Sequence, residues 1–337
     1  MLYADQRWIG NHGIGRFASR VLTGLNYSSI QLSGNPATAL DSWYLARALR
    51  NVTSEDLFFS PGYNSPLYCR APFVFTIHDL SHIYCPENSS AAIKLYYATI
   101  LKRNCHRAAA ILTVSEFTRK QIISWSGVSA DKVFNVSCGV DSAYSYKSKA
   151  YEFPFDYLLC VSNRKEHKNE LRLIEAFAKS GVPSDVHLVF TSQSSPNLMR
   201  ILDRYDLTNR VHFVGNVPEA QLPSLYRGAK ALVFPSLYEG FGLPILEAMA
   251  SGTPVVTSNV TAIPEVAGDA ALLVNPTSVE DISKAIVRIL TDSYLREHLR
   301  ENGLSRAKNF SWQNTLAKTS QVLNRLMLGS AEEKIAG

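Results

Sequence analysis

Short apolar runs alternate along this chain with longer segments whose apolar residues recur at helical spacing. This alternation predicts parallel β-sheets with helices packed on both faces, and therefore an α/β fold class. The apolar runs that we expect to form strands lie at residues 2–4, 57–59, 73–78, 111–114, 133–136, 157–161, 186–190, 211–214, 231–234, 255–258 and 270–274. The helices that we expect between them include residues 91–107, 170–179, 243–250 and 279–291, and one that Ser195 and Pro196 start and that runs to about residue 205.

One segment interrupts the pattern. Residues 141–156 are rich in Ser, Tyr and Lys and show no apolar periodicity, which is typical of a linker. A chain of 337 residues is also long enough for about two domains. We therefore predict two doubly wound, Rossmann-like parallel-sheet domains, at residues 1–146 and 147–310, followed by a C-terminal helix at residues 311–330.

Composition excludes several classes of protein. No apolar run approaches the roughly 20 residues needed to cross a bilayer, and the N-terminus shows no basic-then-apolar signal segment. The 5 scattered cysteines contain no C-x-x-C pair, which favours a reduced, cytoplasmic chain without a structural zinc site. The net charge of +5 fits an anionic substrate, an anionic membrane surface or an ordinary soluble surface. Basic runs with interleaved aromatics are absent from the sequence, so nucleic acid is not an expected partner.

The strongest candidate for chemistry follows the apolar run at residues 231–234, where a glycine turn leads into a helix. The amides of this turn and the positive end of the helix dipole suit a phosphate. Glu239 and Glu247 flank the turn, and they would repel an anion. We therefore expect them to accept hydrogen bonds from hydroxyls of a sugar and a ribose, unless the segment is an ordinary loop with solvated acids. The turn residues are Gly240, Phe241, Gly242 and Leu243.

Three other segments place polar groups at strand ends. Gly13 and Gly15 belong to a G-x-G loop that opens a helix, and such a loop holds a diphosphate or is only a tight turn. His78 ends a predicted strand, where ligands of open sheets bind, or it is satisfied by a neighbouring carbonyl. Arg164 and Lys168 lie between a strand and a helix, where they neutralise a diphosphate or remain solvated.

The residues from Glu239 to Val256, EGFGLPILEAMASGTPVV, resemble the E-x7-E signature of retaining glycosyltransferases of family 4, which have the two-domain GT-B fold. The resemblance implies that Glu239 contacts the donor sugar and Glu247 the nucleotide ribose. It also implies two domains that face a cleft. The GIGRF segment is similar to the glycine-rich loop of the family, which lies near the acceptor and the donor phosphates.

Further segments extend the resemblance. His78, in an HDL segment followed by Pro86 and Glu87, is similar to the histidine that contacts the donor sugar in related enzymes. NRKEHKN resembles the Arg-and-Lys phosphate clamp, and the turn at Gly215 and Asn216 is similar to the one that passes the nucleotide base. CGVD resembles the NGVD turn that closes the first domain. The resemblance implies that the C-terminal helix crosses back onto that domain.

These segments together imply transfer of a hexose, with retained anomeric configuration, from a nucleoside diphosphate sugar. The chain has no D-x-D triplet, so we expect no metal and no cofactor beyond this co-substrate. The motifs are most similar to bacterial enzymes that use GDP-mannose or GDP-rhamnose. The expected acceptor is a lipid-linked or polysaccharide chain in O-antigen or capsule synthesis, met at the inner face of the cytoplasmic membrane. The alternatives are a UDP-hexose enzyme, a non-catalytic partner subunit, a nicotinamide dehydrogenase and a sugar-nucleotide epimerase.

Overall fold

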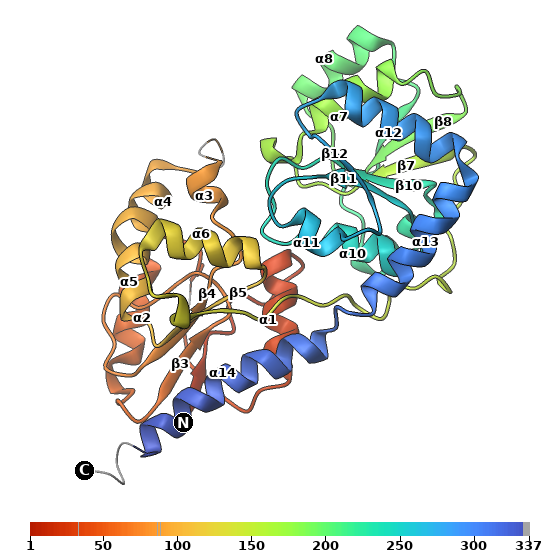
Figure 1. Cartoon of the computed structure of the whole chain (residues 1–337). Coiled ribbons are helices and arrows are strands. Elements are labelled where there is room, and N and C mark those ends of the chain that lie inside the picture. The colour runs from red at the N-terminus through yellow and green to blue at the C-terminus, as the bar shows by residue number, and fades with distance from the viewer. Residues whose placement is uncertain (33, 86, 88, 333–337) are drawn as a thin grey trace. The chain divides into compact units, whose positions relative to one another are not determined.

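The computed structural model describes residues 1–332 except 33, 86 and 88, so Pro86 of the HDL segment lies outside the described residues. The chain forms two compact units. The first unit joins Met1–Gly139 to Ser311–Gly337, and the second is Val140–Phe310 (Figure 1).

The first unit contains one parallel sheet of six strands in the order β2-β1-β3-β4-β5-β6. The central strands are apolar and fully buried, as the continuous apolar runs predict. The strand order changes direction between β1 and β3, which is the switch point of this sheet. The strands are β1 (Leu2–Ala4), β2 (Ser28–Ser29), β3 (Leu57–Ser60), β4 (Phe73–Thr76), β5 (Ala110–Thr113) and β6 (Val133–Asn135).

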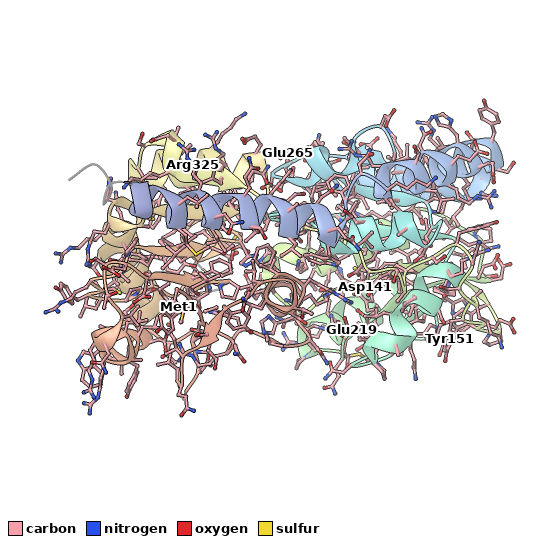
Figure 2. All side chains as sticks on the ribbon, turned by 90° about the horizontal axis from the view of Figure 1, so that it is seen from below. Met1, Asp141, Tyr151, Glu219, Glu265 and Arg325 are labelled. Carbon is pink, nitrogen blue, oxygen red and sulfur yellow. The ribbon has the colours of Figure 1, made fainter. Side chains whose placement is uncertain are left out.

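Helices cover this sheet. The single helix expected over residues 91–107 is confirmed as one continuous helical segment, although its centre, Tyr97–Leu101, is π-helical. The helix α14 packs on α1, since a Cβ atom built on Gly24 would lie 2.1 Å from Leu316. Both views show α14, which carries Arg325, running along this unit (Figure 1 and Figure 2). The helices are α1 (Gly13–Thr23), α2 (Asp41–Ala48), α3 (Ser81–Tyr84), α4 (Ala91–Tyr96), α5 (Lys102–Arg107), α6 (Glu116–Ser126) and α14 (Trp312–Glu332).

The second unit contains a second six-stranded parallel sheet, in the order β12-β11-β10-β7-β8-β9. This is the strand order of a Rossmann fold, with its switch point between β7 and β10. Apolar residues of β7, β8 and β10 form its core together with α7 and α12. The strands are β7 (Asp156–Cys160), β8 (Val186–Phe190), β9 (Val211–Phe213), β10 (Ala231–Phe234), β11 (Val255–Ser258) and β12 (Leu272–Val274).

In the second unit, α8 begins where its capping residue predicts. Ser195 accepts a hydrogen bond from the amide of Leu198, and Pro196 occupies the first turn of α8. The helices are α7 (Glu170–Lys179), α8 (Pro196–Tyr205), α9 (Leu222–Gly228), α10 (Leu243–Ala250), α11 (Ile263–Ala267), α12 (Val279–Thr291) and α13 (Ser293–Ala307).

The chain passes from the first unit to the second between Gly139 and Val140, earlier than the boundary expected after residue 146. The reason is that the predicted linker packs on the second unit. The ring of Tyr146 contacts two guanidinium groups, whose central carbons lie 4.3 Å (Arg227) and 5.0 Å (Arg300) from the ring centre. The expected boundary is therefore too late, because a segment without apolar periodicity is held by stacking on arginine side chains.

Candidate functional site

Lys168 and Glu239 meet at the switch point of the second sheet. Lys168 lies in the loop after β7 and Glu239 in the loop after β10, and the carboxyl ends of such strands are where ligands of open parallel sheets bind. The Lys168 Nζ lies 2.6 Å from the Glu239 Oε1, and the two side chains are 13% and 12% exposed. Two residues predicted separately from the sequence thus form one partly buried ion pair.

Asn169 fixes the loop that carries Lys168. Its backbone is left-handed, with a φ of 64°, and its side-chain amide donates to the carbonyls of Pro235, at 2.9 Å, and Pro276, at 2.7 Å. The carbonyl of His167 accepts from the Leu237 amide at 2.7 Å. The loops after β7 and β10 are therefore bonded to each other. The sequence analysis missed Asn169, although an asparagine just before a helix is a signal for a left-handed or capping position.

The N-terminus of α10 lies directly after Glu239. Gly242 has a φ of 102°, which favours glycine, and no side chain of the described residues caps the helix. The Glu239 amide donates to Thr261 Oγ1 at 3.2 Å, which holds the start of the turn. Phe241 is buried against Phe310, with ring centres 5.9 Å apart. The first-turn amides, Leu243 among them, give this end of α10 a partial positive charge.

Glu247 lies on the buried side of α10. It is 2% exposed, and its Oε2 accepts a hydrogen bond of 2.7 Å from the Tyr226 hydroxyl of α9. The hydroxyl thus satisfies one carboxylate oxygen within the unit. The expectation that Glu247 contacts a ribose stays a prediction.

The side chain of Arg164 contacts other residues than the side chain of Lys168 does. Its guanidinium lies over the rings of Phe213, at 4.9 Å, and Phe190, at 5.6 Å, which end β9 and β8. Its Nη1 donates to Glu170 Oε2 at 2.5 Å, and Glu170 is the first residue of α7. Arg164 is thus bound on the β8–β9 side, whereas Lys168 contacts the loop after β10. The sequence analysis did not single out Glu170, which reads as an ordinary acidic residue in the first turn of a helix.

Gly215 and Asn216, the predicted base-pocket residues, follow β9. Gly215 has a φ of 75°, and the nearest atom to a Cβ built there is the Cγ of Gln193 at 4.0 Å. The backbone conformation and not a lack of space therefore requires glycine at this turn. Asn216 is exposed beside it.

The glycine-rich loop of the first unit packs tightly at the start of α1. A Cβ on Gly15 would lie 2.2 Å from the carbonyl oxygen of Gly10, so the two backbone segments touch. Gly13 is the first residue of α1, and His12 caps the helix, because its Nδ1 accepts from the Gly15 amide at 3.0 Å. Burial, and next the charge of Arg16, lower the pKa of His12. The sequence analysis did not predict this cap.

His78 lies two residues beyond β4, at the carboxyl edge of the first sheet. The strand was expected to reach it but ends at Thr76. The Nε2 of His78 donates to the carbonyl of Pro61 at 2.8 Å, and the ring meets Phe17 edge-on at 4.8 Å. Burial lowers the pKa of His78, so the neutral ring is favoured, with its lone pair at Nδ1. One of the two alternatives stated for His78 was that a neighbouring carbonyl satisfies it, and the structure shows this for its Nε2.

Within the part of the chain that the structure describes, no three or more His, Cys, Asp or Glu residues gather so that they could hold a metal ion. Of the described helices, none is both long and apolar enough to cross a membrane. The predicted residues fall into two groups, with Gly13, Gly15 and His78 in the first unit and the others in the second.

Two family models match the chain. The model "Glycosyltransferase Family 4" matches residues 18–144, and "Glycosyl transferases group 1" matches residues 149–306. The first match covers the first sheet except β1, and the second match covers the whole of the second sheet.

Known proteins of similar sequence and fold support the same assignment to glycosyltransferases. The chain is 35% identical over 271 residues to O-antigen chain mannosyltransferase B of Escherichia coli, covering 76% of this chain and 70% of that protein. It is 31% identical over 252 residues to O-antigen chain mannosyltransferase RfbU of Salmonella typhimurium, covering 73% of this chain and 68% of that protein. The structure of sucrose-phosphate synthase from Thermosynechococcus elongatus superposes with a TM-score of 0.79 at 19% identity, covering 97% of this chain and 99% of that one. This likeness confirms the predicted GT-B fold class of two Rossmann-like domains. The chain therefore belongs to the group 1 and family 4 glycosyltransferases.

Proposed function

We propose that this chain transfers mannose from GDP-mannose to a hydroxyl of a saccharide or lipid-linked saccharide during surface-polysaccharide synthesis. GDP-rhamnose is the other GDP-sugar that the sequence motifs favour. The proposal takes its sugar and its pathway from the two relatives at 35% and 31% identity, which are named as O-antigen chain mannosyltransferases. It further holds that the anomeric configuration is retained and that no metal ion takes part.

The ion pair of Lys168 and Glu239 carries the proposal. A nucleoside diphosphate that leaves a sugar develops negative charge, which Lys168 and the amides at the start of α10 would stabilise. An ammonium group has three donors, so Lys168 keeps its bond to Glu239 while it donates to a phosphate oxygen. Glu239 has acceptor capacity left for the hydroxyls of the donor sugar.

The reaction needs no covalent intermediate. The bond between the sugar C1 and the diphosphate oxygen breaks, and a bond from C1 to the acceptor oxygen forms on the same face of the sugar. The acceptor proton passes to an oxygen of the departing diphosphate, and GDP leaves with it. Glu239 orients the donor sugar in this scheme. A trapped sugar ester on Glu239 would contradict the scheme.

A lipid-linked acceptor requires contact with a membrane surface, and one face of the first unit suits it. We call it the basic aromatic face; it consists of α2 with the residue before it, the loop at residues 65–72, and α5. These segments are joined, since the Leu67 amide donates to the Ser42 carbonyl and Arg107 donates to the Leu67 carbonyl. Exposed aromatic and aliphatic side chains lie there beside exposed cations, a combination typical of membrane-surface contacts. These residues are Leu40, Trp43, Tyr44, Arg47, Leu67, Tyr68, Arg70, Lys102 and Arg103.

Product analysis tests the proposal. The purified chain is incubated with a synthetic lipid-diphosphate saccharide and, in turn, GDP-mannose, GDP-rhamnose and UDP-glucose, with and without EDTA. We expect an α-linked mannoside from the α-configured GDP donor, identified by the one-bond carbon–proton coupling at C1, with a rate that EDTA leaves unchanged. An inverted product, or a rate abolished by EDTA, would exclude the retaining, metal-independent mechanism. If sugar is transferred from UDP-glucose alone, the proposed GDP-sugar donor is wrong and the donor is a UDP-sugar.

A matched pair of lysine variants tests the site. Lys168→Met should lower kcat by about 100-fold or more, in the range measured when one donor to a developing oxyanion is removed. Lys165→Met removes an exposed cation from the same loop and should leave kcat within about twofold.

A further inference from the structure

The ends of β7, β8 and β9 bring together a flat cation, a buried carboxylate and two aromatic rings. The guanidinium of Arg164 lies over the ring of Phe213, and its Nη1 donates a hydrogen bond to Glu170. The loop after β8 is hydrogen-bonded to the loop after β7, because the Ser162 amide donates to Thr191 Oγ1 at 3.4 Å. All these residues belong to the second unit.

Several polar atoms at this place are buried and have no hydrogen-bond partner among the described residues. They are Arg164 Nε, Arg164 Nη2, Glu170 Oε1 and Ser192 Oγ. Glu170 is 8% exposed and Ser192, two residues beyond β8, is 7% exposed. Buried charged groups without partners are costly, so a ligand that both accepts from Arg164 and donates to Glu170 fits the place.

The base of the donor nucleotide meets this requirement if it is guanine. Guanine carries N–H donors at N1 and N2, side by side, which suit a carboxylate oxygen, and acceptors at O6 and N7, which suit a guanidinium. Uracil has one N–H between two carbonyl oxygens, so a carboxylate opposite that edge would face an oxygen. From this we infer that Arg164 and Glu170 read the donor base and select guanine over uracil.

This inference reassigns Arg164. Its place between a strand and a helix predicts that it neutralises the diphosphate together with Lys168. In the structure Glu170 already balances its charge, and its ring neighbours Phe190 and Phe213 end the two strands next to Gly215 and Asn216, the turn predicted to pass the base. The ring of Phe213 is partly exposed and adds apolar surface on which a base can stack, whereas Phe190 is fully buried beneath it. Lys168 and the start of α10 remain for the diphosphate.

The inference rests on the proposed function to the extent that a nucleoside diphosphate sugar binds at this switch point. Calorimetric titration of the full chain with GDP, IDP and UDP tests it, because IDP differs from GDP only in lacking the N2 amino group. We expect GDP to bind about 10-fold more tightly than IDP and about 100-fold more tightly than UDP, as expected for one and two lost base contacts. These comparisons use the unaltered protein, so they do not depend on the folding of a variant.

The variant Glu170→Gln tests whether Glu170 is the residue that recognises the N2 amino group of guanine. An amide in place of the carboxylate turns one acceptor oxygen into a donor, so the preference for GDP over IDP should fall to about twofold or less. Glu166→Gln is the matched control, since Glu166 is an exposed carboxylate of the same loop, and it should leave the preference unchanged. Equal losses of GDP, IDP and UDP affinity in Glu170→Gln would overturn the inference, because Glu170 would then act only on the shared diphosphate through Arg164.

The outcomes separate this inference from the proposed function. Mannose transfer by a chain that binds GDP, IDP and UDP equally would leave the transferase proposal and reject base reading. Selective binding of GDP that depends on Glu170, without any transfer of sugar, would reject the transferase proposal and support base reading.

Discussion

At the scale of single residues, Lys168 and Glu239 depend on each other. Both side chains are largely shielded from water, and each is the ion-pair partner of the other. Removal of one member of such a pair leaves the other charge buried and unpaired, which costs more than removal of both. We therefore expect Lys168→Met to lower the free energy of unfolding by about 3 kcal/mol. The variant Lys168→Met/Glu239→Gln should recover part of this loss.

Urea titration followed by circular dichroism measures this coupling. All 4 tryptophans, Trp8, Trp43, Trp125 and Trp312, belong to the first unit, so their fluorescence transition is an internal control. The urea midpoint of this fluorescence transition should stay unchanged, while the midpoint of the second unit falls. If the two substitutions act additively, the ion pair contributes nothing and the geometry of the candidate site is wrong.

The residues of the site were predictable one by one, but their pairing was not. A cation before a helix and a carboxylate after a strand are both visible in the sequence. Lys168 and Glu239 are brought together only because β10 pairs directly with β7, which is a property of the strand order. In the same way Glu170 gave no signal, because its role depends on the direction that the Arg164 side chain takes.

At the scale of elements, the cap of α1 makes this helix sensitive to pH. His12 Nδ1 accepts a hydrogen bond from the Gly15 amide, which only the neutral ring can do. The pKa of His12 in the folded chain lies below the ordinary 6.5, because burial and the charge of Arg16 disfavour the cation. As the pH falls through 6.5, the unfolded chain binds the proton first. The contribution of His12 to stability is therefore present above pH 6.5 and is lost as the pH falls below it.

His12→Asn should remove this dependence, since an asparagine oxygen accepts the same hydrogen bond and does not titrate. The urea midpoint, followed by tryptophan fluorescence of the first unit, should fall less between pH 7 and pH 5 in the variant than in the unaltered chain. His12→Ala should lower stability at pH 7 by about 1 kcal/mol through loss of the cap. His298→Asn, at an exposed position of α13, is the control. An identical pH dependence in His12→Asn would show that the cap does not titrate.

Several helices were placed well by the sequence, and α8, α10 and α12 among them have a capping serine or a proline at the start. The bounds predicted for α7, α10 and α12 agree with the structure, and α8 starts at Pro196 as expected. The strand β2 was missed because Ser28 and Ser29 are polar and pair only at the sheet edge. The helices α3 and α11 are too short for an apolar period to be visible.

At the scale of the whole molecule, the chain crosses between the units twice, at places that lie together. The Val140 amide donates to the Phe310 carbonyl at 3.3 Å, and a Cβ on Gly139 would lie 2.2 Å from the Trp312 backbone nitrogen. The number of domains and the place of the C-terminal helix followed from the apolar pattern and the resemblance. The exact crossing point did not, since it is decided by close backbone contact at Gly139 and by the packing of Tyr146.

The basic aromatic face makes a prediction about the molecule as a whole. Its segments contain one acidic residue, Asp41, which is buried and bonded to Arg7 at 2.6 Å, so the exposed charges of the face are positive. Each cation near an anionic bilayer contributes about 1 kcal/mol. Arg47→Gln with Arg70→Gln should therefore weaken binding to phosphatidylglycerol vesicles by about 30-fold.

Co-sedimentation with vesicles of defined composition measures this binding. The unaltered chain should bind phosphatidylglycerol vesicles, release with added salt, and bind phosphatidylcholine vesicles far less, because the attraction to anionic headgroups is electrostatic. Trp43→Ser should also weaken binding, since tryptophan prefers the interface. Lys284→Gln and Tyr294→Ser remove an exposed cation and an exposed aromatic ring from the second unit, and both should bind as the unaltered chain does. If vesicle binding falls as much in these control variants, net charge and non-specific hydrophobic adsorption, rather than this face, direct the chain to the membrane.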